Sequence, residues 1–129
     1  MTTQTKATDV FVTAGDIPWQ DLGDGVRRKI LGYNDAMMMV RVEFEAGAIG
    51  AQHRHPHVQC AVVEKGSFDV TIDGRTQRLN TGDGYMVPSN ILHGVVALEP
   101  GVLLDIFTPI REDFLGEPVA YAASPGAVK

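Results

Sequence analysis

Three of the four histidines in this chain lie at alternate positions within five residues, a spacing suited to binding a metal ion. Side chains two positions apart on a strand project from the same face, so His53 and His55 would lie side by side. Neutral imidazole nitrogens are good ligands for Zn, Cu, Fe and Ni. His57 and Gln59 would join this face if the run stayed extended, whereas Pro56 could bend it. The pattern predicts a metal site that needs further ligands from elsewhere in the chain.

The fourth histidine, His93, is a candidate for one of those ligands. It lies in the segment PSNILHG, after a turn, and two antiparallel strands could bring it next to His53 and His55. A single histidine is more often a surface residue or a hydrogen-bonded core residue than a ligand. His57 is therefore left unassigned.

A carboxylate interrupts the apolar segment VLLDIF, residues 102–107. In a strand, Asp105 shares one face with Leu103 and Phe107, while the even-numbered residues share the other. Both faces are otherwise apolar, and a buried carboxylate is costly unless it is paired or used. Asp105 is thus a candidate for proton transfer, the alternative being a buried carboxylate satisfied by backbone amides. The apolar even face needs a cover, either an N-terminal segment or a second subunit.

Arg111 follows this segment in TPIREDFL and could hold a substrate carboxylate through its forked N–H groups. The alternative is a solvated arginine paired with Glu112 or Asp113. The acidic residues beside Arg111 are expected to be ordinary polar surface.

The elements that must position these residues are short strands. Fourteen glycines and seven prolines separate β-branched runs, and no segment keeps an apolar helical period for three turns. Asp73-Gly74 is a strong hairpin signal. Turns every 8–12 residues or so favour an all-β sandwich or barrel. Strands are expected over residues 26–31, 37–44, 59–65, 68–72, 75–79, 85–87, 94–98 and 102–107.

Length and charge exclude several classes of function. The 129 residues suit one domain, here residues 26–115, preceded by an N-terminal segment (1–25) that is partly a covering or swapped strand and followed by an irregular tail (116–129). A net charge of −5 argues against nucleic acid and anionic membranes as partners. The lone Cys60 favours a reducing compartment, and no signal-like or membrane-spanning stretch is present, so a cytoplasmic location is expected.

Two stretches resemble the two sequence motifs of the cupin family. The first is GAIGAQHRHPHVQCAVVEKG, residues 47–66, in which Gln59 occupies the position of the usual glutamate. The second is GDGYMVPSNILHGVVA, residues 82–97, in which Asn90 replaces the usual glycine and Ala97 a common asparagine. The resemblance implies a small cupin jelly-roll barrel with a metal inside.

The ligands implied by this resemblance are His53, His55, Gln59 and His93. They would bind one divalent transition metal such as Zn, Ni, Mn, Fe or Cu. An amide in place of a carboxylate leaves the ion its full +2 charge, which favours Lewis-acid chemistry. The alternative is that Gln59 only hydrogen-bonds within the barrel, and the metal is held by three histidines and waters.

A closer resemblance, over about residues 47–115, is to the KdgF group of pectin-degradation cupins. It implies that Asp105, Phe107 and Arg111 line the site, and that the reaction opens the ring of 4,5-unsaturated uronates released by pectin or alginate lyases. On this reading Asp105 and Arg111 are catalytic, and Phe107 and Arg111 bind an acidic sugar. A small cupin with an apolar outer strand face also suggests a homodimer. The alternatives are a metal-dependent cupin dioxygenase and a non-catalytic sugar-binding cupin.

Overall fold

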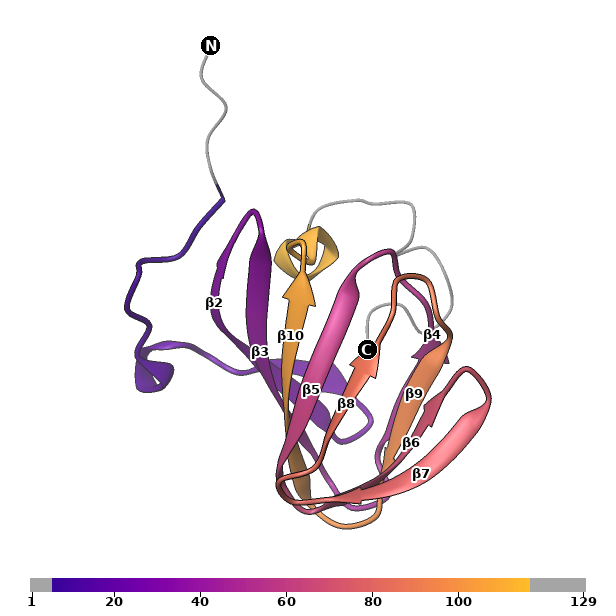
Figure 1. Ribbon diagram of the computed structural model, residues 1–129. Helices are drawn as coiled ribbons and strands as arrows, with labels where there is room; N and C mark the ends of the chain where they lie inside the picture. The colour runs from indigo at the N-terminus through magenta and orange to yellow at the C-terminus, as the bar shows by residue number, and fades with distance from the viewer. Residues whose placement is uncertain (1–5, 117–129) are drawn as a thin grey trace.

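Two antiparallel sheets face each other in this computed structural model, which describes residues 6–116 (Figure 1). The six-stranded sheet contains, in spatial order, β1 (Gln20–Gly23), β2 (Val26–Asn34), β3 (Met37–Phe44), β10 (Gly101–Thr108), β5 (Val58–Lys65) and β8 (Gly84–Val87). The four-stranded sheet contains β4 (Ile49–His53), β9 (His93–Ala97), β6 (Ser67–Ile72) and β7 (Arg75–Asn80). Two short 3₁₀ turns, η1 (Ala14–Asp16) and η2 (Glu112–Leu115), complete the described elements. The expected all-β barrel is confirmed.

All eight strands expected from the sequence are present, and β1 and β4 are additional. The hairpin between β6 and β7 turns at Asp73 and Gly74, whose φ angles of 52° and 77° are those of a type I′ turn. The histidine run is not one continuous strand, because β4 ends at His53 and the chain bends at Pro56 and His57 before β5 begins. The run therefore crosses from one sheet to the other.

The segment before residue 26 belongs partly to the six-stranded sheet. Its strand β1 pairs with β2 of the same chain, with Gln20 opposite Arg28. Further upstream, the backbone N–H of Thr8 donates to the carbonyl of Tyr33 on β2 at 3.0 Å. Apart from its first residue, the irregular tail expected over residues 116–129 lies outside the described residues. Among residues 6–116, no helix is long and apolar enough to cross a membrane.

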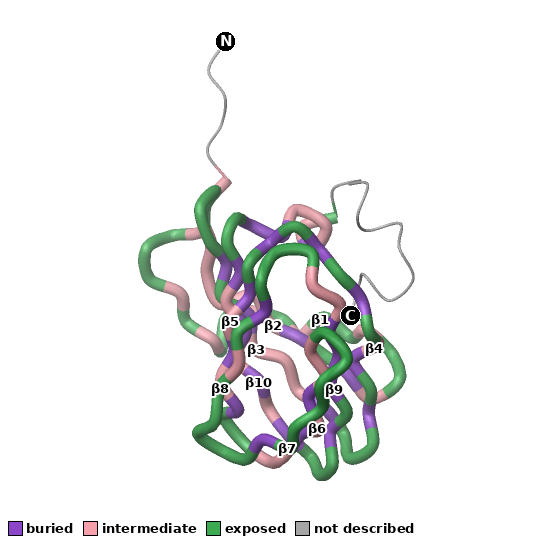
Figure 2. Tube along the Cα trace, turned by 45° about the vertical axis from the view of Figure 1, so that its right-hand side comes forward, coloured by how far each residue is buried: buried purple, intermediate pink, exposed green. Residues whose placement is uncertain are grey.

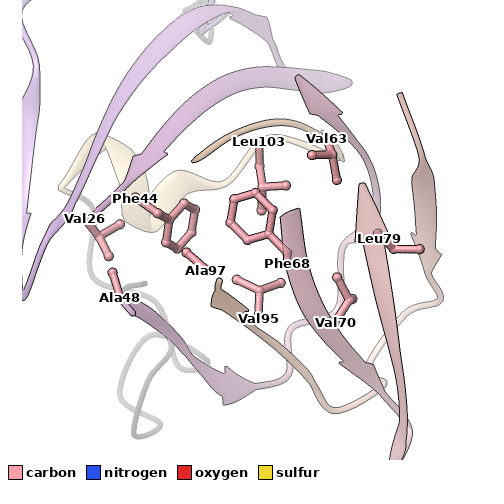
Figure 3. Packing of buried hydrophobic residues seen from close by; sticks show 10 residues of the cluster. All are labelled: Val26, Phe44, Ala48, Val63, Phe68, Val70, Leu79, Val95, Ala97 and Leu103. Atoms are coloured by element: carbon pink, nitrogen blue, oxygen red, sulfur yellow. The ribbon is translucent and has the colours of Figure 1, made fainter. Parts of the chain in front are cut away.

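A cluster of apolar side chains fills one end of the space between the sheets (Figure 3). The rings of Phe44 and Phe68 meet edge to face at its centre, with centroids 5.2 Å apart. Such a contact adds about 0.5–1.5 kcal/mol to the effect of burial alone. Buried positions alternate with exposed ones along several strands, as Figure 2 shows, because successive strand residues point to opposite faces. The remaining members are Val26, Ala48, Val63, Val70, Leu79, Val95, Ala97 and Leu103.

Strand β10 links this cluster to a second one near its carboxyl end. Leu103 belongs to the first cluster and Phe107 to the second, and Asp105 lies between them on the same inward face. The expected alternation along β10 is thus observed. The outward residues Leu104 and Ile106 are half-buried and line a shallow apolar depression on the outer face of the sheet. The homodimer expected from this apolar face stays a prediction.

Two motif glycines provide a test of the turn geometry. Gly47 and Gly66 have φ angles of 81° and 82°, but an added Cβ at Gly47 meets open space, whereas one at Gly66 would lie 2.7 Å from the carbonyl oxygen of Pro100. We expect Gly47→Ala to lower the free energy of unfolding by about 1–2 kcal/mol through backbone strain alone. Gly66→Ala should cost roughly 2 kcal/mol more, because the backbone must also move. Equal losses in urea denaturation would contradict this reading of the turn.

Candidate metal centre and active site

The fold brings the three histidines expected as ligands into one cluster. One ring nitrogen each of His53, His55 and His93 lies within 4.8 Å of the other two. His53 on β4 and His93 on β9 are direct cross-strand partners, with ring centroids 4.5 Å apart. His55 follows β4 and places its ring 4.8 Å from that of His93. Two paired strands and the start of the bend thus build the cluster.

Backbone carbonyls fix the tautomer of each of these histidines. A carbonyl oxygen can only accept a hydrogen bond, so the Nδ1 atom facing it must carry the proton. The other ring nitrogen, Nε2, then keeps its lone pair. Nδ1 of His53 donates to the carbonyl of Ala51 at 2.8 Å, Nδ1 of His55 to that of His57 at 3.2 Å, and Nδ1 of His93 to that of Ile91 at 2.8 Å.

Gln59 adds a fourth acceptor. Its Nε2 donates to Oδ1 of Asp105 at 3.2 Å, which turns its Oε1 toward the histidines. That oxygen lies 3.0 Å from Nε2 of His55 and 3.1 Å from Nε2 of His93. With the histidine tautomers fixed as above, acceptors face acceptors with no proton between them, which is favourable only when a cation binds there. Three imidazoles and an amide oxygen therefore fit a divalent transition metal.

Burial keeps these imidazoles neutral and ready to bind a metal. It lowers the pKa of His55 to about 3 and that of His93 to about 4, and it also lowers the pKa of His53. The positive charge of Arg111 depresses each of these pKa values further. Metal ligands must be unprotonated, so the site is in its binding form at neutral pH.

Asp105 faces the cavity that the metal cluster borders. This cavity is also lined by His53, Gln59, His93 and Phe107. Burial raises the pKa of Asp105 to about 7, against the hydrogen bond from Gln59 and the charge of Arg111. The sequence left open a carboxylate satisfied by backbone amides, but the hydrogen bond found here comes from the Gln59 side chain.

Arg111 lies at the same cavity and is almost fully buried, with 1% of its surface exposed. Its Nε and Nη2 donate to the two carboxylate oxygens of Asp113 at 3.0 and 2.8 Å. One expected alternative was a solvent-exposed Arg111 paired with Glu112 or Asp113. Arg111 does pair with Asp113, but the expected solvent exposure was wrong. Asp113 is not ordinary surface either, because η2 folds its side chain back against Arg111, leaving 3% exposed.

His57 is buried but lies outside the three-histidine cluster. Its Nε2 is 2.9 Å from the carbonyl oxygen of Ile110, which joins the bend before β5 to the segment after β10. Its ring also meets those of His55 and Phe107 edge to face, with centroids 5.4 and 6.5 Å away. His57 thus packs against His55 and Phe107 of the site without being one of the three clustered histidines.

Arg28 and Phe114 also line the cavity, and neither was predicted from the sequence as a site residue. Arg28 is 8% exposed, and its guanidinium lies 3.7 Å from the ring centroid of Phe114. Burial lowers the pKa of Arg28 to about 10, with a further lowering by Arg111 and an opposing effect of Asp113. The available signal was the alternation along β2, which puts residue 28 on the same inward face as Val26.

The shifted pKa values predict how the stability of the metal-free protein depends on pH. Unfolded histidines bind protons near pH 6.5, whereas folded His55 and His93 do so only near pH 3 and 4. Between pH 6.5 and 4, acidification should therefore let each lower the free energy of unfolding by at most about 1.4 kcal/mol per pH unit. Asp105 acts oppositely in this window, because its folded carboxyl is protonated near pH 7 and its unfolded one near 3.8.

The net expectation is a loss of stability on acidification, measured by urea denaturation of chelator-treated protein. Asp105→Asn removes the opposing contribution, so the loss should be steeper in this variant. A stability that stays flat between pH 6.5 and 4.5 in both proteins would contradict the assignment of neutral, buried histidines.

Comparisons with known proteins agree with this architecture. Residues 40–107 match the family model described as a cupin domain. The chain is 53% identical over 102 residues to the pectin degradation protein KdgF of Dickeya dadantii, covering 78% of this chain and 93% of that protein.

Two solved structures are similar over most of their length. KdgF from a Halomonas species superposes with a TM-score of 0.79 at 38% identity, over 83% of this chain and 99% of that one. An RmlC-like cupin from Shewanella frigidimarina superposes with a TM-score of 0.82, also at 38% identity, over 84% and 97% of the two chains. The fold, the histidine cluster and these similarities together show that this chain belongs to the cupin family, within its KdgF-type group.

Proposed function

We propose that this protein catalyses the metal-dependent ring opening of 4,5-unsaturated uronate monosaccharides in pectin or alginate catabolism. The observation that carries the proposal is the placement of the Asp105 carboxylate at one cavity with four converging metal-binding acceptors. The similarity to a pectin degradation protein supports the choice of substrate. An acidic sugar is accordingly the proposed small-molecule partner.

The reaction is an isomerisation that needs no second reactant. The proton of the C1 hydroxyl is removed, the C1 carbonyl forms and the bond between C1 and the ring oxygen breaks. The electron pair passes through the ring oxygen and the C4–C5 double bond, so that C5 becomes a ketone and C4 takes up a proton. A single side chain that accepts the proton of the C1 hydroxyl and then donates it to C4 therefore accounts for every proton.

Asp105 is the proposed proton carrier. It faces the cavity, and the amide of Gln59 holds it in place through Oδ1. A carboxylate so placed can accept the hydroxyl proton and return it to C4 within one turnover, an effect worth roughly 10²–10⁴ in rate.

The metal, the arginine and the aromatic ring complete the site. A divalent transition metal of the Zn, Ni, Mn, Fe and Cu class, bound by His53, His55, Gln59 and His93, would act as a Lewis acid toward substrate oxygens. Arg111 orients the uronate carboxylate, and Phe107 provides a flat apolar surface against the sugar ring. Its ring lies 5.0 Å from the Arg111 guanidinium carbon, so the two side chains are adjacent.

The protein is also proposed to act as a homodimer. The outer face of β10, β5 and β8 presents half-buried Leu104, Ile106 and Cys60 beside exposed Met86. A second copy seated on this face would cover these apolar side chains. The cytoplasmic location expected from the sequence stays a prediction.

The reaction can be followed by ultraviolet absorbance. Metal-loaded protein added to unsaturated galacturonate or mannuronate should speed the loss of the conjugated double bond well beyond the spontaneous rate, and chelation should abolish the gain. Consumption of dissolved oxygen in step with the sugar would indicate a dioxygenase instead. Sugar binding with no change in the absorbance decay would indicate a binding module, and the proposed function would be wrong.

The role of Asp105 is tested by Asp105→Asn. An asparagine oxygen can still accept the Gln59 hydrogen bond, so metal content should stay at the parental level. Turnover should fall by about 10²–10⁴. Asp69→Asn, at a carboxylate that pairs with Arg78 on the four-stranded sheet, is the matched control and should keep parental turnover. A parental rate in Asp105→Asn would remove Asp105 from the mechanism.

A further inference from the structure

The cavity contains a second guanidinium that the proposed mechanism does not use. Arg28 projects inward from β2, lines the cavity together with Asp105 and Arg111, and is 8% exposed. Its cross-strand partner on β1 is Gln20, whose Oε1 accepts a hydrogen bond from Arg28 Nε at 2.8 Å. The β1–β2 hairpin thus holds the stem of the side chain.

A single aromatic ring brings the two arginines together. The guanidinium carbon of Arg28 lies 3.7 Å from the ring centroid of Phe114, and that of Arg111 lies 4.3 Å from the same centroid. Arg28 comes from the start of the domain and Arg111 from the segment after β10, so the fold joins two distant parts of the chain at Phe114. Cation–π contacts of this kind fix the position of a guanidinium without neutralising its charge.

Arg111 alone is poorly arranged to grip a carboxylate. The bidentate grip of arginine uses two parallel N–H bonds on one edge of the guanidinium. In Arg111 the Nε and Nη2 donors of such an edge are both directed at Asp113. In Arg28, by contrast, Nε donates to the neutral amide oxygen of Gln20.

The two buried guanidinium groups lie close together, and the carboxylate of Asp113 acts on both. Each guanidinium loses hydration on burial, and the charge of Arg111 acts on Arg28. An anion bound between them gains charge-assisted hydrogen bonds from both guanidinium groups.

We propose that Arg28 is a substrate-binding residue, which receives the carboxylate of the uronate jointly with Arg111 at the Phe114 end of the cavity. The substrate class rests on the proposed function, whereas the preference for an acidic over a neutral sugar does not. Gln20 and Phe114 are positioning residues for Arg28. Arg28 thereby sets the specificity of the site for acidic sugars.

The test compares Arg28→Gln with Arg27→Gln, which removes the same charge at the adjacent, outward-facing position, where Arg27 pairs with Glu43. In ring opening, Arg28→Gln should raise KM about 10- to 100-fold with a much smaller change in kcat, because a charge-assisted carboxylate contact is lost. Arg28→Lys keeps the charge but loses the fork and should fall between. Arg27→Gln should match the parent, and thermal unfolding identifies any variant that does not fold.

A binding measurement separates this proposal from the proposed function. By calorimetry, metal-loaded parent should bind saturated galacturonate more tightly than galactose, and Arg28→Gln should lose this preference while keeping its affinity for galactose. If the parent binds the acid preferentially but opens no ring, the proposed function is wrong, and the calorimetric comparison still tests the role of Arg28 in acid binding. An unchanged KM and an unchanged acid preference in folded Arg28→Gln or Arg28→Lys would overturn the proposal, as would equal losses for both sugars.

Discussion

The side-chain amide of Gln59 is the interaction on which the rest of the site depends. An amide has a donor end and an acceptor end, and here the donor end faces Asp105 while the acceptor end faces His55 and His93. A glutamate, usual at this position in the family pattern, would place two carboxylates about one hydrogen bond apart, and they could not both stay ionised. The departure from the family pattern is therefore explained by Asp105: a carboxylate at 105 requires a donor at 59.

The barrel makes this arrangement possible by setting neighbouring strands in register. On the inward face, Gln59 of β5 lies opposite Phe107 of β10, and Asp105 lies opposite Ala61. On the other side of β5, Ala61 lies opposite Tyr85 of β8, and its small side chain leaves room in this row. Burial and the nearby Asp105 raise the pKa of the Tyr85 phenol well above its usual value. Apolar clusters on either side of this polar layer keep water out, which is why burial dominates the pKa shifts of its histidines and its carboxyl group.

The sequence predicted the parts of the site that depend on local periodicity. The alternation in VLLDIF placed Asp105 inward, and the spacing of His53 and His55 indicated a cluster that His93 would complete. The rest depends on contacts between distant segments. Arg28 lies in a run of three basic residues that resembles surface, but β1 and Phe114 pack against it. Asp113 pairs with Arg111 because η2 folds back on that side chain.

The same contacts explain how an acidic chain could select an acidic ligand. The net charge of −5 repels anions at long range, but in physiological salt this field is screened beyond about 8 Å. Selection must then occur within the cavity, where the guanidinium groups of Arg28 and Arg111 lie against Phe114 in a medium of low polarity. Under the proposed roles, the two guanidinium groups share the substrate carboxylate, and Asp113 acts on both of them. The β1–β2 hairpin and the segment after β10 would then supply the charges that bind an acidic sugar, and β10 the proposed proton carrier.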